Sequence, residues 1–183
     1  AGLDLDLCEI VAIGLALPTA SDSPANCLYA QTRETTTEVD MLNGFWRFVL
    51  DVQRSHGTLI GFNCLLFDLP ILLRRSLYLG IPTPTLQIDK YRHDGVIDLQ
   101  HELTYGGRMT WRSLAFYKRR FSLDVPEDPH DGADIAGLVA AKNWAAVEAH
   151  CKTDAATTAA LALRMGLIQM PAEAEQPALV EVA

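Results

Sequence analysis

The sequence predicts a single mixed α/β domain in which helices cover both faces of a sheet. Short runs of aliphatic and β-branched residues alternate along the chain with longer stretches of helical spacing, and this order is typical of α/β proteins. The chain has 183 residues, a length that suits one domain with its own core. We expect residues 1–170 to form that domain and residues 171–183, which lack periodicity, to form a loose tail.

Three strands are expected in the first third of the chain. Residues 9–17 read EIVAIGLAL and end at Pro18, which is typical of a buried strand. Residues 19–26 are rich in turn formers, so residues 27–31 are expected to return as the second strand of an antiparallel hairpin. Residues 58–62 predict the third strand.

Five helices are expected from apolar spacing and from residues that start or stop helices. Pro70 stands in the first turn of one of them, and Gly166 ends the longest, which contains eight alanines. The interval 82–107 holds many Pro, Thr and Gly residues and predicts only a short strand or helical turn near residues 96–103. The expected helices span residues 40–56, 69–79, 113–120, 135–140 and 144–165.

Composition excludes several classes of protein. No apolar run approaches the roughly 20 residues that a membrane span needs, and acidic N-terminal residues stand where a signal peptide would be basic. We therefore expect a cytoplasmic protein. The four cysteines show no zinc-ligand spacing and are expected to be reduced core residues. The net charge of -8 argues against a broad electrostatic grip on nucleic acid, and it argues more against a pure binding module than against an enzyme that uses divalent cations.

Two acidic residues far apart in the sequence are the candidates for chemistry. Asp68 follows the strand expected at residues 58–62, at the strand end where α/β proteins commonly bind ligands. Asp154 lies on the longest expected helix, and His150 lies one turn earlier on the same face. Carboxylates are the ligands that Mg²⁺ prefers. Two such ions, about 3.5 to 4 Å apart, can stabilise the attacking and leaving oxygens of phosphodiester hydrolysis.

The motifs around these residues resemble those of a known family. Residues 63–70 read N-x-x-x-F-D-L-P, and residues 150–157 read H-C-x-x-D-x-x-T. In this order they resemble the second and third motifs of DEDD-type 3'-5' exonucleases, especially the proofreading exonuclease of family-B DNA polymerases and its small stand-alone relatives. Similar residues also fall at residues 98–99, 112–114 and 131–132, so the resemblance covers nearly the whole chain.

The resemblance implies a fold, a reaction and a set of roles. The fold would be a ribonuclease H-like mixed sheet flanked by helices, and the reaction would release nucleoside 5'-monophosphates from 3' ends with two Mg²⁺ or Mn²⁺ ions. Asp154 would bind one metal directly, Asp68 would hold the second metal or its water, and His150 would orient the nucleophilic water. The residues expected to bind substrate are Asn63, Phe67 and Arg112.

The chain departs from the family pattern in two places. His150 takes the position of the tyrosine in Tyr-x-x-x-Asp, whereas the histidine branch of the superfamily uses a spacing one residue longer; a histidine can still orient or deprotonate water. The first motif of the family contains Asp-x-Glu, but residues 1–4 match only its end. The strand that carries this motif is therefore expected to be missing or truncated at the N-terminus. Alternatively, Asp4 and Asp6 form a degenerate first motif, although little room is left before the strand at Glu9.

Simpler structural roles are open for the same residues. Asp68 before Leu-Pro could be a helix cap, and His150 with Asp154 could be a solvated i, i+4 pair. The basic residues between 108 and 120 could be an ordinary solvated surface or could contact phosphates. The aromatic residues among them could stack on unpaired bases or pack in the core.

The sequence therefore predicts a metal-dependent 3'-5' exonuclease that acts on single-stranded DNA 3' ends. RNA is left open as a substrate, because sugar discrimination depends on contacts that spacing does not reveal. The competing class is a domain of the same fold that binds nucleic acid or a partner protein without cleaving, and a phosphoesterase of free nucleotides is a third option. The oligomeric state is left open, and a partner chain could supply the missing strand by strand addition.

Overall fold

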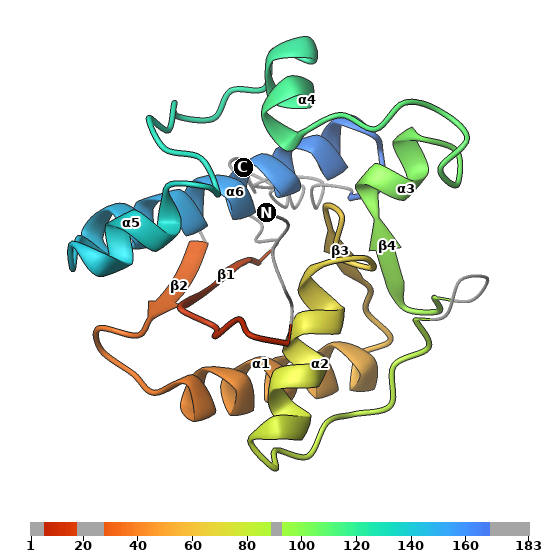
Figure 1. Ribbon diagram of the computed structural model, residues 1–183. Helices are drawn as coiled ribbons and strands as arrows, with labels where there is room; N and C mark the ends of the chain where they lie inside the picture. Colours follow the sequence, from red (N-terminus) through yellow and green to blue (C-terminus); the bar gives the residue numbers. More distant parts are fainter. Residues whose placement is uncertain (1–5, 18–27, 89–92, 169–183) are drawn as a thin grey trace, which may run out of the picture.

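A computed structural model describes residues 6–17, 28–88 and 93–168. In this part of the chain, short strands lie between the long helix α6 (Trp144–Arg164) on one side and the pair α1 (Glu38–Arg54) and α2 (Asp68–Tyr78) on the other (Figure 1). The structure is thus a mixed α/β arrangement with helices on both sides of its strands, as the sequence predicted. The tail expected at residues 171–183 lies outside the described residues.

The strands form two separate pairs in the described part of the chain. β1 (Ala12–Ala16) and β2 (Leu28–Thr32) are antiparallel, with Gly14 opposite Ala30, so both strands of the expected hairpin are confirmed. β3 (Leu59–Gly61) and β4 (Val96–Asp98) are parallel. One sheet was expected, but no described strand forms hydrogen bonds to both pairs, so they remain two sheets of two strands.

The helices α1 and α2 form one core with the strands. Thr37 caps α1 by accepting a hydrogen bond from the Asp40 backbone N–H at 3.1 Å, and the apolar side of α1 is buried in the spacing that the sequence predicted. The indole of Trp46 donates a hydrogen bond to Ser76 Oγ of α2 at 2.7 Å, in the buried interior. The core residues of α1 are Met41, Leu42, Phe45, Trp46 and Val49.

A buried ion pair joins α1, α2 and the chain before β1. Arg75 donates from Nε and Nη2 to the two carboxylate oxygens of Glu38, both at 2.8 Å, and Glu38 also accepts from the Ile10 N–H at 2.9 Å. The Glu38 side chain is 7% exposed. Its pKa is lowered, because these hydrogen bonds and the Arg75 and Arg33 charges outweigh the opposing effect of burial, which is the largest single influence.

The second half of the chain consists of helices around α6. In the interval where a short strand or a helical turn was predicted near residues 96–103, the structure has both, since β4 leads directly into the short helix α3 (Leu99–Leu103). The helices α4 (Leu114–Arg120) and α5 (Ile135–Ala140) also agree with the sequence prediction. α6 packs against β1, β2 and β3 and against all three of these short helices. No described helix is long and apolar enough to cross a membrane.

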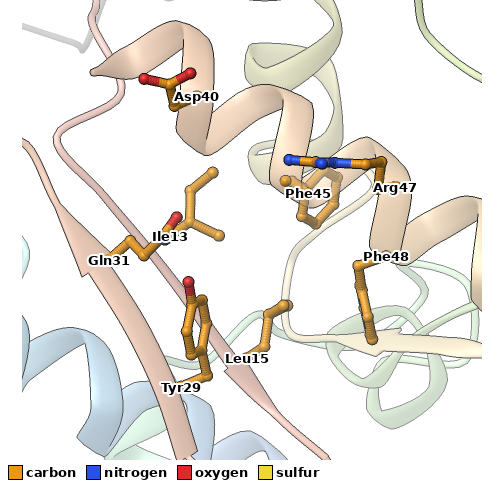
Figure 2. A pocket seen from close by; sticks show the side chains of 9 residues that line it. Ile13, Leu15, Tyr29, Gln31, Asp40, Phe45, Arg47 and Phe48 are labelled. Carbon is orange, nitrogen blue, oxygen red and sulfur yellow. The ribbon is translucent and has the colours of Figure 1, made fainter. Parts of the chain in front are cut away.

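A pocket of about 350 Å³ lies between α1 and the β1–β2 pair. Figure 2 shows Tyr29 and Gln31 of β2 and Ile13 and Leu15 of β1 facing residues of α1 across this space. Neither Asp68 nor Asp154 lines it. The pocket is therefore separate from the carboxylates that the sequence singled out.

Candidate active site

The loop that carries Asp68 is fixed by Asp98, the last residue of β4. The buried Asp98 carboxylate accepts hydrogen bonds from the backbone N–H groups of Asn63 at 2.9 Å and Leu65 at 3.0 Å. It also caps α3 by accepting from the N–H of Gln100 at 2.9 Å and of His101 at 3.3 Å. One side chain therefore satisfies the backbone of two segments that are more than thirty residues apart.

Asp68 is the first residue of α2, and the structure does not use it as the helix cap. The N-cap position is Phe67, and no side chain makes a capping hydrogen bond there. Asp68 is exposed to solvent, so ions and substrate can reach its carboxylate. Near the N-terminus of a helix, a negative charge interacts favourably with the helix dipole. The structure thus gives Asp68 a place suited to binding a ligand rather than a capping role.

The Asp154 charge acts on the carboxylate of Asp68. The pKa of Asp68 is raised to about 6, chiefly by loss of hydration; the neighbouring charges of Asp98 and Asp154 add to the rise, and a hydrogen bond from its own backbone opposes it. Loss of hydration also raises the pKa of Asp154, with Asp128 adding to the shift and His150 and Lys118 opposing it. The fold therefore concentrates negative charge at this point from α2, β4 and α6, and that charge is not fully balanced.

His150 is held by a second carboxylate that the sequence analysis did not single out. Its Nδ1 lies 2.6 Å from Oδ2 of Asp128, and the two side chains are 13% and 14% exposed. Its Nε2 lies 3.5 Å from Oδ2 of Asp154, whose side chain is 57% exposed. His150 thus stands between a buried carboxylate on one side and a solvent-accessible one on the other.

Asp128 itself is positioned by the loop at residues 126–132. Its second oxygen accepts a hydrogen bond from the His130 backbone N–H at 2.9 Å. Lys118 of α4 donates to the Pro126 carbonyl at 2.7 Å and lies 3.3 Å from Glu127. The available signal in the sequence was a carboxylate placed between Pro126 and Pro129, but nothing in the spacing connects it to His150.

β1 passes α6 at very short range beside these residues. A Cβ atom at Gly14 would lie 2.7 Å from Sγ of Cys151 and 2.9 Å from its carbonyl oxygen. Such distances are too short for a side chain, so only glycine allows this approach. The close contact fixes the part of α6 that carries His150 and Asp154.

The cysteines near the site are protonated thiols. Burial raises the pKa of Cys151 to about 12, with the Asp154 and Asp68 charges adding to the effect, and burial together with Asp98 and Asp68 raises the pKa of Cys64. Cys64 and Cys151 are free thiols, as expected, while Cys27 lies outside the described residues. Thiolate nucleophiles and thiolate metal ligands are therefore not favoured here.

The donor set fits a hard divalent cation bound by few protein ligands. Asp68 and Asp154 supply carboxylate oxygens, and a cation bound there would offset the effect of the Asp154 charge on Asp68. Mg²⁺ is commonly held by one or two carboxylates together with water and substrate phosphate. In the described part of the chain, no group of three or more His, Cys, Asp or Glu side chains is arranged to hold a metal. Asp4 lies outside the described residues, whereas Asp6 accepts hydrogen bonds from Arg74 and Tyr78 in the second half of α2.

The three residues expected to bind substrate lie on two different segments. Asn63 and Phe67 belong to the Asp68 loop; Asn63 has a left-handed backbone with φ 59°, and its Oδ1 is buried without a described hydrogen-bond partner. Phe67 is 38% exposed. Arg112 precedes α4, where its guanidinium lies 5.3 Å from the centre of the Phe116 ring.

Comparison with known proteins identifies the family of the chain. A family of predicted 3'-5' exonucleases related to the exonuclease domain of PolB matches residues 3–179. No curated protein matches the chain. The family match covers both strand pairs, the Asp68 loop and the whole of α6, and thus every residue of the site described above.

Proposed function

The chain belongs to the family of predicted 3'-5' exonucleases related to the exonuclease domain of PolB, and from this membership we propose that it hydrolyses single-stranded DNA from its 3' end. The products would be nucleoside 5'-monophosphates, and the fold would be a ribonuclease H-like one. The observation that carries the proposal is that the Asp154 charge acts on the distant Asp68 carboxylate, while His150 Nε2 lies 3.5 Å from Asp154 Oδ2. Residues 1–170 as one domain and a cytoplasmic location stay predictions from the sequence.

Asp68 and Asp154 are the residues that would hold Mg²⁺ or Mn²⁺, with two ions expected. Bound there, divalent cations would supply charge stabilisation for the attacking and leaving oxygens of the phosphodiester. Both side chains can be reached from solvent, so substrate phosphate can complete the coordination. A bound cation would also favour the ionised form of Asp68, whose pKa is raised chiefly by loss of hydration.

His150 would orient the attacking water and take its proton. In the neutral ring, Nδ1–H donates to Asp128 and leaves the lone pair on Nε2, which faces Asp154. A water hydrogen-bonded to Nε2 can attack phosphorus; the new P–O bond forms as the bond to the 3' oxygen breaks, and the leaving oxygen takes a proton from solvent. Asp128 would keep the ring in the required tautomer and direction throughout.

Asn63 and Phe67 would contact the terminal nucleotide, because they lie on the loop that positions Asp68. The unpartnered Oδ1 of Asn63 is a group that a substrate could satisfy, since buried polar atoms without partners are costly. The half-exposed Phe67 ring offers an apolar contact to a base or sugar. Both roles fit a loop whose backbone is already fixed by Asp98.

A non-catalytic domain is the second candidate, and one observation favours it. The described residues contain no metal-binding group of three or more side chains, so two carboxylates alone would have to retain the ions. Such a domain would bind nucleic acid or a partner protein without cleaving it. Activity assays separate the two candidates directly.

The deciding experiment is digestion of a 5'-labelled single-stranded DNA in Mn²⁺, with Asp154→Ala as the test variant. The matched control is Asp51→Ala, which removes a carboxylate that is 71% exposed on α1. We expect a ladder that shortens from the 3' end with the parent and with the control, and none with Asp154→Ala. A folded parent that produces no ladder would support the non-catalytic domain. An RNA oligonucleotide of the same sequence would test sugar preference.

A further inference from the structure

An uninterrupted basic segment lies beside the candidate site. Residues 104–123 contain five of the fifteen Lys and Arg residues of the chain and no Asp or Glu, although the whole chain has a net charge of -8. This local charge is opposite to that of the molecule as a whole. The basic residues are Arg108, Arg112, Lys118, Arg119 and Arg120.

Four of these five cations are available to a ligand. Lys118 is buried, and its ammonium group binds the Pro126 carbonyl and the Glu127 carboxylate. The four arginines are exposed, and none of them pairs with a carboxylate among the residues that the structure describes. Arginine that has no internal partner is well suited to phosphate, which accepts two hydrogen bonds from its planar fork.

Exposed aromatic rings lie among the arginines. Tyr105 is 70% exposed, Trp111 47% and Phe116 36%, and the Arg112 guanidinium lies over the Phe116 ring. The Trp111 indole lies beside Gly107, where an added Cβ would meet its Nε1 at 3.9 Å. Cationic side chains interleaved with aromatic rings bind single-stranded nucleic acid, because phosphates pair with the cations and bases stack on the rings.

The backbone that presents these rings is fixed. The hydroxyl of the fully buried Thr104 accepts from the Gly107 N–H at 3.1 Å, and the Thr104 carbonyl accepts from Arg108 and Met109. Left-handed φ angles at Tyr105 and the two following glycines make this tight loop possible. A preformed loop loses little conformational entropy when a ligand binds.

This surface is connected to the candidate site by short contacts. α4 packs on α6, and Figure 1 shows α4 beside α6 with α3 close by. Gln100 of α3 donates to the Arg112 carbonyl at 3.0 Å. Lys118 of α4 binds the loop that carries Asp128, the partner of His150. A chain leaving the site can therefore pass directly onto α4 and the loop before it.

We propose that the arginine surface, formed by Tyr105, Arg108, Trp111, Arg112, Phe116, Arg119 and Arg120, binds the single-stranded tract that lies on the 5' side of the nucleotide being cleaved. The proposal rests on the proposed function for its polarity, since a 3' end held at Asp68 and Asp154 leaves only the 5' part of the strand to extend outward. Bases stack on the exposed rings and phosphates pair with the arginines. A duplex binds less well, because its bases keep their faces stacked on each other.

Fluorescence anisotropy of a labelled fifteen-nucleotide DNA, measured in EDTA to prevent cleavage, tests the binding. Loss of one stacked base costs about 5- to 150-fold in Kd, so Trp111→Ala is expected to raise Kd at least fivefold. Arg112→Ala is expected to weaken binding and to lower the slope of log K against log salt by about 0.7. The matched controls are Tyr29→Ala, an exposed ring of β2, and Arg47→Ala, an exposed cation of α1.

Both outcomes of the binding measurement are informative. Variants of the surface that bind like the controls would overturn the proposal, and so would a parent that prefers duplex DNA or does not bind. An RNA strand of equal sequence shows whether the surface distinguishes the sugar. Circular dichroism of each variant confirms folding, and the substituted side chains are exposed, so little loss of stability is expected.

Cleavage kinetics separate this proposal from the proposed function. With a long substrate, Trp111→Ala is expected to raise KM, whereas with a dinucleotide, too short to reach the surface, it should behave like the parent. If the parent cleaves and the variant shows no such dependence on length, the surface has no part in binding while the exonuclease stands. If DNA binds at the surface and no cleavage occurs, the surface stands and the exonuclease is wrong.

Discussion

Replacement of Asp128 by asparagine tests whether the buried partner of His150 contributes to catalysis. The bond from Nδ1 to Oδ2 is 2.6 Å long and nearly closed to solvent. An asparagine can turn its NH₂ group toward Nδ1, which moves the ring proton to Nε2 and removes the acceptor that faces Asp154. A hydrogen bond to a charged group contributes about 1.5 to 3 kcal/mol, so kcat is expected to fall by a factor of about 10 to 150.

The assay is single-turnover cleavage of a 5'-labelled strand, with KM determined in parallel. KM is expected to stay near the parent value, because Asp128 touches His150 rather than the segments proposed to bind the strand. Nitrogen chemical shifts of the His150 ring report the tautomer, and a merely structural role would leave them unchanged. The matched control is Asp134→Asn, since Asp134 lies 3.8 Å from His130 Nδ1 in an exposed pair.

Two results would refute this reasoning. An unchanged kcat in Asp128→Asn would show that the ring needs no partner, and an equal loss in Asp134→Asn would show that the loop, and not the hydrogen bond, is responsible. A rise in KM alone would show that Asp128 acts in substrate binding and not in the chemical step. Asparagine keeps an oxygen for the His130 N–H, so the fold of the loop is expected to persist.

Three further predictions concern stability. The pKa of Asp68 is higher in the folded protein than in the unfolded chain, so the metal-free protein loses stability as pH rises from 3.8 to about 6. Asp68→Asn is therefore expected to raise Tm at pH 7.5 but not at pH 3.5. Mn²⁺ is expected to raise Tm in the parent but not in this variant. Gly14→Ala is expected to lower the free energy of unfolding, measured in urea, by about 1 to 3 kcal/mol. Adding Cys151→Ala should restore only part of this free energy, because the clash with the Cys151 carbonyl oxygen at 2.9 Å persists. Glu38→Gln leaves Arg75 without its ion pair and is expected to cost about 3 kcal/mol; in the parent the lowered Glu38 pKa stabilises the fold above pH 4.5, and that stability is lost as pH falls further. Equal Tm values in parent and variant across these pH ranges would contradict the two carboxylate predictions.

The sequence predicts best those elements that are long enough to show a regular spacing of apolar residues. α1 and α6 each contain enough turns for apolar spacing or alanine content to define them, and their observed bounds lie close to the predicted ones. β4 and α3 are too short for any period, since they have 3 and 5 residues, so the sequence left their type open. The backbone of this region is set by Asp98, which binds a loop far away in the chain.

The candidate site was predictable only in part for the same reason. Asp68, His150 and Asp154 were found because they lie in motifs with fixed local spacing, and their proposed roles await the assays above. Asp128 lies 22 residues from His150 in a loop without periodicity, so no local pattern marks the pair. Contacts of this kind depend on how α6 packs, which follows from the whole fold rather than from either segment.

Asp98 has a consequence for how the two halves of the substrate path would act together. The loop leading to Asp68 and the helix leading to Tyr105 are both fastened to this one carboxylate. Neither segment can shift without the other, so the candidate site and the surface proposed to bind the strand are held at a fixed distance from each other. A strand bound at both places would meet Asp68 and Asp154 at a constant distance from the arginine surface, and a strand too short to span that distance would be held by the candidate site alone.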